Sequence, residues 1–152
     1  MRRLATVKEV MTVKVVTAGP EGTAEEVARL MEKNNIGCVV VVKDHKPVGI
    51  VTEKDLGYGV VARNKLAREV RVREIMAKGL KTIKPEATVI EASKLMARHR
   101  IRRLPVVKNG LLVGIVTDMD IIPLTQQMVD TLEGISGYVF NLFYKGIKRA
   151  EE

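Results

Sequence analysis

The alternation of apolar and polar residues in the first third of the chain predicts a helix followed by two buried strands. Val27, Leu30 and Met31 recur at helical spacing, so we expect a helix over this stretch. Continuous apolar runs at 38–42 and 48–51, separated by polar residues, predict two strands joined by a turn. A shorter β-like run at 13–17 precedes the helix, and a second helix is expected after Thr52. The predicted order is β-α-β-β-α.

The same pattern returns 65 positions later, so the chain contains an internal repeat. Residues 7–56 align with 72–121 without an insertion or deletion, and 20 of the 50 aligned pairs are identical. Such a repeat indicates that one unit cannot bury its apolar face alone and packs on its copy. We therefore expect an α+β fold in which two β-α-β-β-α repeats pack with pseudo-two-fold symmetry.

Helix-capping signals stand at the same place in both copies. Thr23 with Glu26, and Thr88 with Glu91, match the capping box, in which the Thr side chain accepts from a free amide and the Glu side chain accepts from the cap amide. These pairs predict where the first helix of each repeat begins.

The chain divides into three segments. Residues 1–71 hold repeat 1 with its opening segment and a basic connection, 72–121 hold repeat 2, and 122–152 form a predicted helical tail. The tail carries an apolar stripe at helical steps. This stripe either covers the protein's own core or forms a subunit interface. Isologous dimers are the commonest oligomers, so a subunit interface is as well supported as a cover for the core.

The composition fits a folded protein without a membrane span or a metal centre. Apolar residues make up 46% of the 152 residues, which suffices for a core. Neither a secretory signal nor a run of 18 apolar residues is found, so we expect a cytoplasmic protein. Cys38 is the only cysteine and His45 and His99 are the only histidines, so no internal disulfide and no metal site are expected.

The net charge of +8 is concentrated in the middle of the chain. Residues 63–110 contain 14 Lys or Arg against 4 Glu. Such a positive field can attract a nucleotide, a nucleic acid or an acidic protein. Binding to nucleic acid is disfavoured, because four of the five aromatic residues lie together at 138–144, away from the basic stretch.

The candidate chemistry lies in a Gly-Ile-Val-Thr-x-x-Asp segment that occurs at 49–55 and again at 114–120. Each copy places a Thr hydroxyl at a helix N-terminus and a carboxylate one turn later on the same face. Free amides at that end can hold a phosphate, and an ionised Asp can accept from both hydroxyls of a ribose. The alternative is an ordinary N-cap with an acidic residue that complements the helix dipole. Its recurrence in register favours a nucleoside phosphate site.

These features resemble a tandem pair of cystathionine β-synthase-type (CBS) domains, also called a Bateman module, over residues 7–121. The resemblance is carried by the segments 10–12 and 75–77 at the start of each repeat, by 99–107, and by the two Gly-Ile-Val-Thr-x-x-Asp segments. It implies two clefts that bind AMP, ADP, ATP or S-adenosylmethionine, each formed by both repeats. It also implies that such modules often pair, which favours a homodimer.

The resemblance assigns a set of binding residues to each cleft. In one cleft, Thr117 and Asp120 would hold phosphate and ribose, Ile115 would face the base, and Arg102 and Arg103 would hold phosphate, with a contribution from repeat 1 by Thr17, Ile36 and Gly37. The other cleft would use, from both repeats, Ile50, Thr52, Asp55, Thr82, Ile101 and Arg102.

The two clefts are not equivalent in charge. Where repeat 2 has Arg102 and Arg103, repeat 1 has Gly37 and Cys38, so the Asp55 cleft lacks two guanidinium groups that could grip phosphate. We expect tighter binding of phosphate in the Asp120 cleft. The Asp55 cleft is expected to be weaker, empty or suited to a less anionic compound.

We interpret the chain as a regulatory sensor of adenosine compounds and not as an enzyme. The sequence contains neither a Walker-type phosphate loop nor a nucleophile with a matching base. The output would pass to an effector protein that the sequence does not identify. The alternatives are a basic nucleic-acid-binding protein whose clefts modulate affinity or stay empty, and a structural dimer with vestigial clefts.

Overall fold

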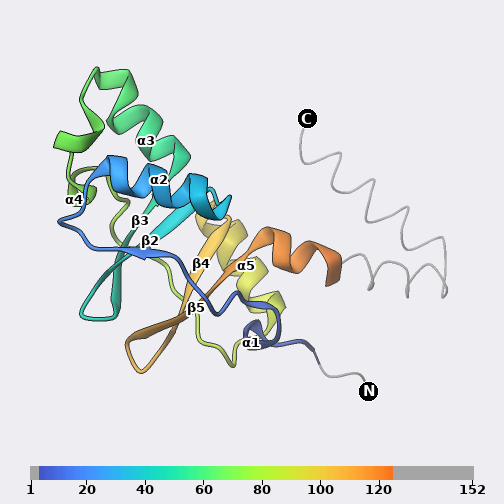
Figure 1. Ribbon diagram of the computed structural model, residues 1–152. Coiled ribbons are helices and arrows are strands. Elements are labelled where there is room, and N and C mark those ends of the chain that lie inside the picture. The colour runs from blue at the N-terminus through green and yellow to red at the C-terminus, as the bar shows by residue number, and fades with distance from the viewer. Residues whose placement is uncertain (1–3, 125–152) are drawn as a thin grey trace, which may run out of the picture. The chain divides into compact units, whose positions relative to one another are not determined.

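The computed structural model describes residues 4–124 and has a mixed α+β fold (Figure 1). The described residues belong to two units, 4–117 and 118–124. In the first unit the elements follow one another as helix α1 (Val7–Val10), strand β1 (Thr17–Ala18), helix α2 (Ala24–Asn34), strands β2 (Cys38–Lys43) and β3 (Lys46–Thr52), helix α3 (Glu53–Gly59), the 3₁₀ turns η1 (Val61–Arg63) and η2 (Ala67–Glu69), helices α4 (Val72–Ile75) and α5 (Val89–His99), and strands β4 (Arg103–Lys108) and β5 (Leu111–Thr117). The described part of the second unit is a helix over 118–124.

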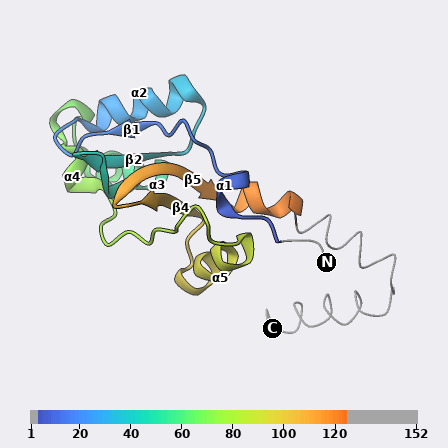
Figure 2. The same cartoon turned by 90° about the horizontal axis from the view of Figure 1, so that it is seen from below.

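The two predicted strand pairs are confirmed and share one register. In repeat 1, β2 pairs antiparallel with β3 from Cys38 opposite Thr52, and in repeat 2, β4 pairs with β5 from Arg103 opposite Thr117. The register shifts at equivalent points, after Val41 and after Val106. The two pairs lie between α2 on one side and α5 on the other (Figure 2).

The strand predicted at 13–17 is shorter than expected. Only Thr17 and Ala18 form β1, which runs parallel to β2. Val16 still accepts from the Val40 amide of β2 at 3.3 Å, whereas Thr12 pairs with Ile115 of β5 in the other repeat, so this segment passes from one repeat to the other before β1. Val13 lies within this passage and is 67% exposed.

Both predicted capping boxes are confirmed. The amide of Glu26 donates to the Thr23 hydroxyl at 3.2 Å, and the Glu26 carboxylate accepts from the Thr23 amide at 2.8 Å. Thr88 and Glu91 form the same contacts at 3.2 and 2.7 Å. Each pair satisfies amides that the first turn of a helix leaves without a partner, so the helix start is fixed locally.

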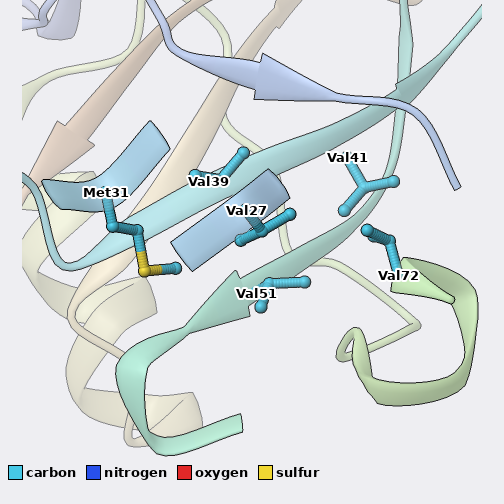
Figure 3. Packing of buried hydrophobic residues seen from close by; sticks show 6 residues of the cluster. All are labelled: Val27, Met31, Val39, Val41, Val51 and Val72. Atoms are coloured by element: carbon cyan, nitrogen blue, oxygen red, sulfur yellow. The ribbon is translucent and has the colours of Figure 1, made fainter. Parts of the chain in front are cut away.

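The core of repeat 1 consists mainly of valines (Figure 3). Val27 and Met31 project from α2 towards Val39 and Val51 of the β2–β3 pair. Val72 of α4 completes the cluster, although it belongs to the start of the second sequence repeat. The sequence repeat and the packed unit are therefore not the same segment.

The opening segments of the two repeats are exchanged. The amide of Val72 donates to the Gly22 carbonyl at 2.9 Å, so α4 is attached to repeat 1. In the equivalent contact the amide of Val7 donates to the Ala87 carbonyl at 2.8 Å, which attaches α1 to repeat 2. Each repeat thus completes the other, and residues 4–117 fold as one interlocked unit.

Two glycines make this exchange possible. A Cβ atom on Gly49 would lie 2.5 Å from Sδ of Met76, and one on Gly114 would lie 2.6 Å from Sδ of Met11. Only a residue without a side chain allows the methionine of the opposite opening segment to lie this close to the strand.

Candidate functional site

The Thr-x-x-Asp part of the first motif forms a capping box at the junction of β3 and α3. The Asp55 carboxylate, through Oδ2, accepts from the Thr52 amide at 2.8 Å and from the Thr52 hydroxyl at 3.0 Å. The Thr52 hydroxyl in turn accepts from the Asp55 amide at 3.4 Å. One carboxylate oxygen is therefore occupied by the helix start. The helix-capping role that the sequence offers as the alternative is thus present in repeat 1, and the second oxygen of Asp55 takes no part in it.

The residues predicted to face the base have their backbone groups engaged between the repeats. Ile50 exchanges two hydrogen bonds with Ala77, at 3.2 and 2.9 Å, and Ile115 exchanges two with Thr12, at 2.9 and 3.0 Å. Their side chains are half-buried. Both isoleucines are thus held where the exchanged segments cross the strands.

Gly37 and Arg103, predicted to share a cleft, are brought together across the two repeats. A Cβ atom on Gly37 would be 3.3 Å from Nη2 of Arg103. The Arg103 charge also lowers the pKa of the neighbouring Cys38 thiol, although burial has the larger effect and raises that pKa. Arg103, the first residue of β4, pairs with Thr117, the last residue of β5. The two residues therefore lie at the same end of the β4–β5 pair.

The remaining predicted residues are placed as follows. Thr17 is exposed at the start of β1, opposite Val40. Thr82 and Arg102 are exposed, whereas Ile36 and Ile101 are half-buried after the C-terminal turns of α2 and α5. Asp120 lies in the helix of 118–124, in the second compact unit.

Two cavities contain residues of the predicted sites. One, of about 470 Å³, is lined by Ile36 and Gly37 together with Met31, Leu56 and Glu53. Its walls combine the apolar side chains of Ala28, Met31 and Leu56 with Asn35 and two carboxylates, Glu32 of α2 and Glu53 at the start of α3. Cavities of this size fall in the range that takes small organic ligands.

The other cavity, of about 420 Å³, lies along α3, η1 and α4 and includes Asp55 with Tyr58, Arg63 and Lys65. Arg63 and Lys65 belong to the connection between the repeats. Their charges do not indicate a binding site in the sequence, because an ordinary solvated segment carries similar charges. Glu53 was equally undetected, although it directly follows Thr52 in the motif. A charged residue adjacent to a motif position is the signal that could have found it.

Within residues 4–124, no group of three or more His, Cys, Asp or Glu side chains is arranged to hold a metal ion. The same residues contain no helix that is both long and apolar enough to cross a membrane.

The sequence model of the CBS domain family matches the chain twice, at residues 7–56 and 72–124. An uncharacterised protein of Methanopyrus kandleri is 43% identical over 133 residues, which cover 86% of this chain and 68% of the relative. The CBS domain-containing protein YhcV of Bacillus subtilis is 37% identical over 113 residues, which cover 74% of this chain and 80% of YhcV.

A similar solved structure is the CBS domain pair of protein MJ0100 in complex with 5′-methylthioadenosine and S-adenosyl-L-methionine. Its TM-score is 0.75 at 29% sequence identity, and the match covers 83% of this chain and 99% of that structure.

Proposed function

This chain belongs to the CBS-domain family and contains two copies of the domain, and from this premise we propose that it is a regulatory sensor of adenosine compounds. AMP, ADP, ATP and S-adenosylmethionine are the candidate ligands. The ligand would bind between the repeats, and the protein would respond by a shift in the population of its conformations. Binding without catalysis is part of the proposal.

The observation that carries this proposal is the contact between the repeats at Gly37. There a guanidinium of repeat 2, Arg103, reaches a position of repeat 1 that has no side chain, beside a cavity with partly apolar walls. Apolar wall for a flat base, with a cation close by, suits a ligand that has a base and an anionic end. The 5′-methylthioadenosine and S-adenosyl-L-methionine named with the similar structure support adenosine compounds as the class.

We also propose unequal clefts, with the stronger anion binding where Arg102 and Arg103 contribute. The matching positions in repeat 1 are Gly37 and Cys38, which offer no positive charge. Asp120 is the proposed ribose acceptor of this cleft, and Asp55 that of the other.

Thermal unfolding with each of the four compounds tests the proposal. A ligand present at a hundred times its dissociation constant stabilises the native state by about 2.7 kcal/mol. Asp120→Asn should remove most of this stabilisation, whereas Asp55→Asn should remove less. At position 55, Asn is the matched replacement because its amide oxygen can still accept from the Thr52 amide, so the cap of α3 is retained. If none of the compounds raises the unfolding temperature, the sensor proposal is wrong.

A homodimer is a further part of the proposal, with an effector protein as the receiver of the signal. Tyr58, Val61 and Leu66 are 65%, 76% and 51% exposed near the end of α3 and the connection, and they support a surface for association. Light scattering of the purified protein, with and without ligand, tests the dimer. A monomer at all concentrations would refute it.

A further inference from the structure

Two side chains of opposite charge converge on Gly37. A Cβ atom on Gly37 would lie 3.3 Å from Nη2 of Arg103 and 3.4 Å from Oε2 of Glu53, so the two atoms are separated by no more than the sum of these distances. Within residues 4–124, neither side chain forms an ion pair with the other or with another group. A guanidinium and a carboxylate therefore lie close to one point without neutralising each other directly.

The backbone fixes both groups at this point. Glu53 is the first residue of α3, and its amide donates to the Gly37 carbonyl at 3.3 Å. Arg103 is the first residue of β4 and is paired with Thr117. Each side chain thus starts from an anchored position, one in each repeat, and Gly37 leaves the space between them open.

The space beside them continues into the cavity of about 470 Å³. Ile36, Met31 and Leu56 supply apolar wall, Glu53 is the carboxylate on its α3 side, and Glu32 is a second carboxylate on its α2 side. A ligand that places an apolar part against this wall would bring its polar end to Glu53 and Arg103.

We propose that Arg103 and Glu53 bind the two charges of an α-amino acid group at the end of an adenosyl ligand, as in S-adenosylmethionine. Arg103 would hold the carboxylate and Glu53 the ammonium group. This inference rests on the proposed function and specifies its ligand class. It replaces a phosphate at Arg103 by a carboxylate.

Charge is the reason for preferring the amino acid to a phosphate. A phosphate that reached Arg103 would also lie close to the Glu53 carboxylate, and like charges repel at this range. An α-amino acid presents one positive and one negative group on a single carbon, so both side chains gain a partner. Charge-assisted hydrogen bonds of this kind are also the stronger ones.

Calorimetric titration with S-adenosylmethionine, 5′-methylthioadenosine and AMP tests the inference. 5′-methylthioadenosine lacks the amino acid group and also the positive sulfonium charge of S-adenosylmethionine. S-adenosylhomocysteine carries the same amino acid group on an uncharged thioether and is titrated in parallel, so the ratio of the dissociation constant of 5′-methylthioadenosine to that of S-adenosylhomocysteine reports on the amino acid group without the sulfonium charge. Glu53→Gln should reduce this ratio by about fivefold or more, the effect of one charge pair at 4 Å even in a water-like dielectric. The affinity for 5′-methylthioadenosine should stay the same, and the affinity for AMP should rise.

Asp44→Asn is the control. Asp44 is an exposed carboxylate in the turn between β2 and β3 and does not line the cavity, so this variant removes the same charge elsewhere in repeat 1 and should leave the ratio unchanged. Asn tolerates the left-handed φ of 51° at this position. An unchanged ratio in Glu53→Gln, or equal weakening of S-adenosylhomocysteine and 5′-methylthioadenosine, overturns the inference while the adenosine sensor stands. Absence of binding by all of these compounds to the unmodified protein removes the proposed function, and this inference falls with it.

Discussion

Replacing Gly49 by alanine tests whether the exchanged opening segments hold the fold together. The new Cβ atom would lie 2.5 Å from Sδ and 2.8 Å from Cγ of Met76, and 3.1 Å from the Ala77 carbonyl oxygen. The methionine side chain can move, but the carbonyl accepts from the Ile50 amide at 3.2 Å and belongs to the cross-repeat pairing. The substitution therefore forces the α4 segment away from β3.

The expected loss follows from this overlap. Overpacking of a filled site costs about 1–3 kcal/mol. Gly57 is the control, because it lies within α3 and a Cβ atom there meets nothing within 4 Å. Alanine at this helix position should stabilise the protein by about 0.5–1 kcal/mol. The two variants should then differ by about 1.5–4 kcal/mol in the free energy of unfolding.

Urea unfolding followed by circular dichroism measures both values. A double variant, Gly49→Ala with Met76→Ala, identifies the cause, because residues in contact show coupling energies of about 0.5–3 kcal/mol. The double variant should be less destabilised than the sum of the single ones. Equal stabilities of Gly49→Ala and Gly57→Ala, or strictly additive losses in the double variant, would show that the Met76 contact does not limit the packing.

Further predictions concern the cap of α5 and the cysteine at the junction. Removing the N-cap hydroxyl by Thr88→Ala should destabilise the protein by about 0.5–2 kcal/mol in urea unfolding, whereas Thr88→Ser should not. Hydrogen bonds from Thr88 lower the pKa of Glu91 in the folded protein. The stabilising effect of this carboxylate is therefore complete above its unfolded-state pKa and is lost as the pH falls through the lower folded-state pKa. Glu91→Gln should flatten the acid limb of the curve of unfolding free energy against pH, and an unaltered limb would refute the assignment. Burial raises the pKa of the Cys38 thiol, and the Arg103 charge offsets part of that rise. Arg103→Met should therefore move the pH profile of Cys38 alkylation by iodoacetamide to higher pH. A shift to lower pH would contradict this prediction.

Local signals predicted the fold well, because they depend on residues close in sequence. Thr23 with Glu26 is a contact over three residues, and the apolar runs of β2 and β3 are joined by a short turn. The exchange of α1 and α4 could not be predicted in this way. The alignment places Val72 at the start of repeat 2, and no local pattern shows that its side chain packs on Val27 of repeat 1.

The candidate site was predicted less completely, for the same reason. Gly37 and Arg103 were expected in one cleft, and the structure brings them together. Glu53 was not expected there, since its position beside Gly37 depends on how the start of α3 packs against the end of α2 and on the approach of Arg103 from the other repeat. The position of Glu53 next to Thr52 is visible in the sequence, but the approach of its carboxylate to Gly37 is not.

Residues that are identical in the two repeats are poor evidence for binding in this protein. Gly49 and Gly114 are needed because a methionine of the opposite opening segment lies against each of them. Thr52 and Asp55 cap α3, so their recurrence in repeat 2 is also what folding alone would select. The recurrence of the motif therefore fits shared packing as well as binding, and recurrence alone does not separate the two.

Function is better sought where the pseudo-symmetry fails. At the hairpin turns, the Leu112 amide donates to the His45 carbonyl at 3.0 Å, and the equivalent bond cannot form because Pro47 has no amide hydrogen. At the junction, Gly37 faces Arg103, whereas the residue equivalent to Gly37 is Arg102. The turn breaks the symmetry of a backbone contact only. At the junction the two repeats differ in charge, and this difference lies beside a cavity. Gly37, Glu53 and Arg103 are therefore the first residues to test for ligand recognition.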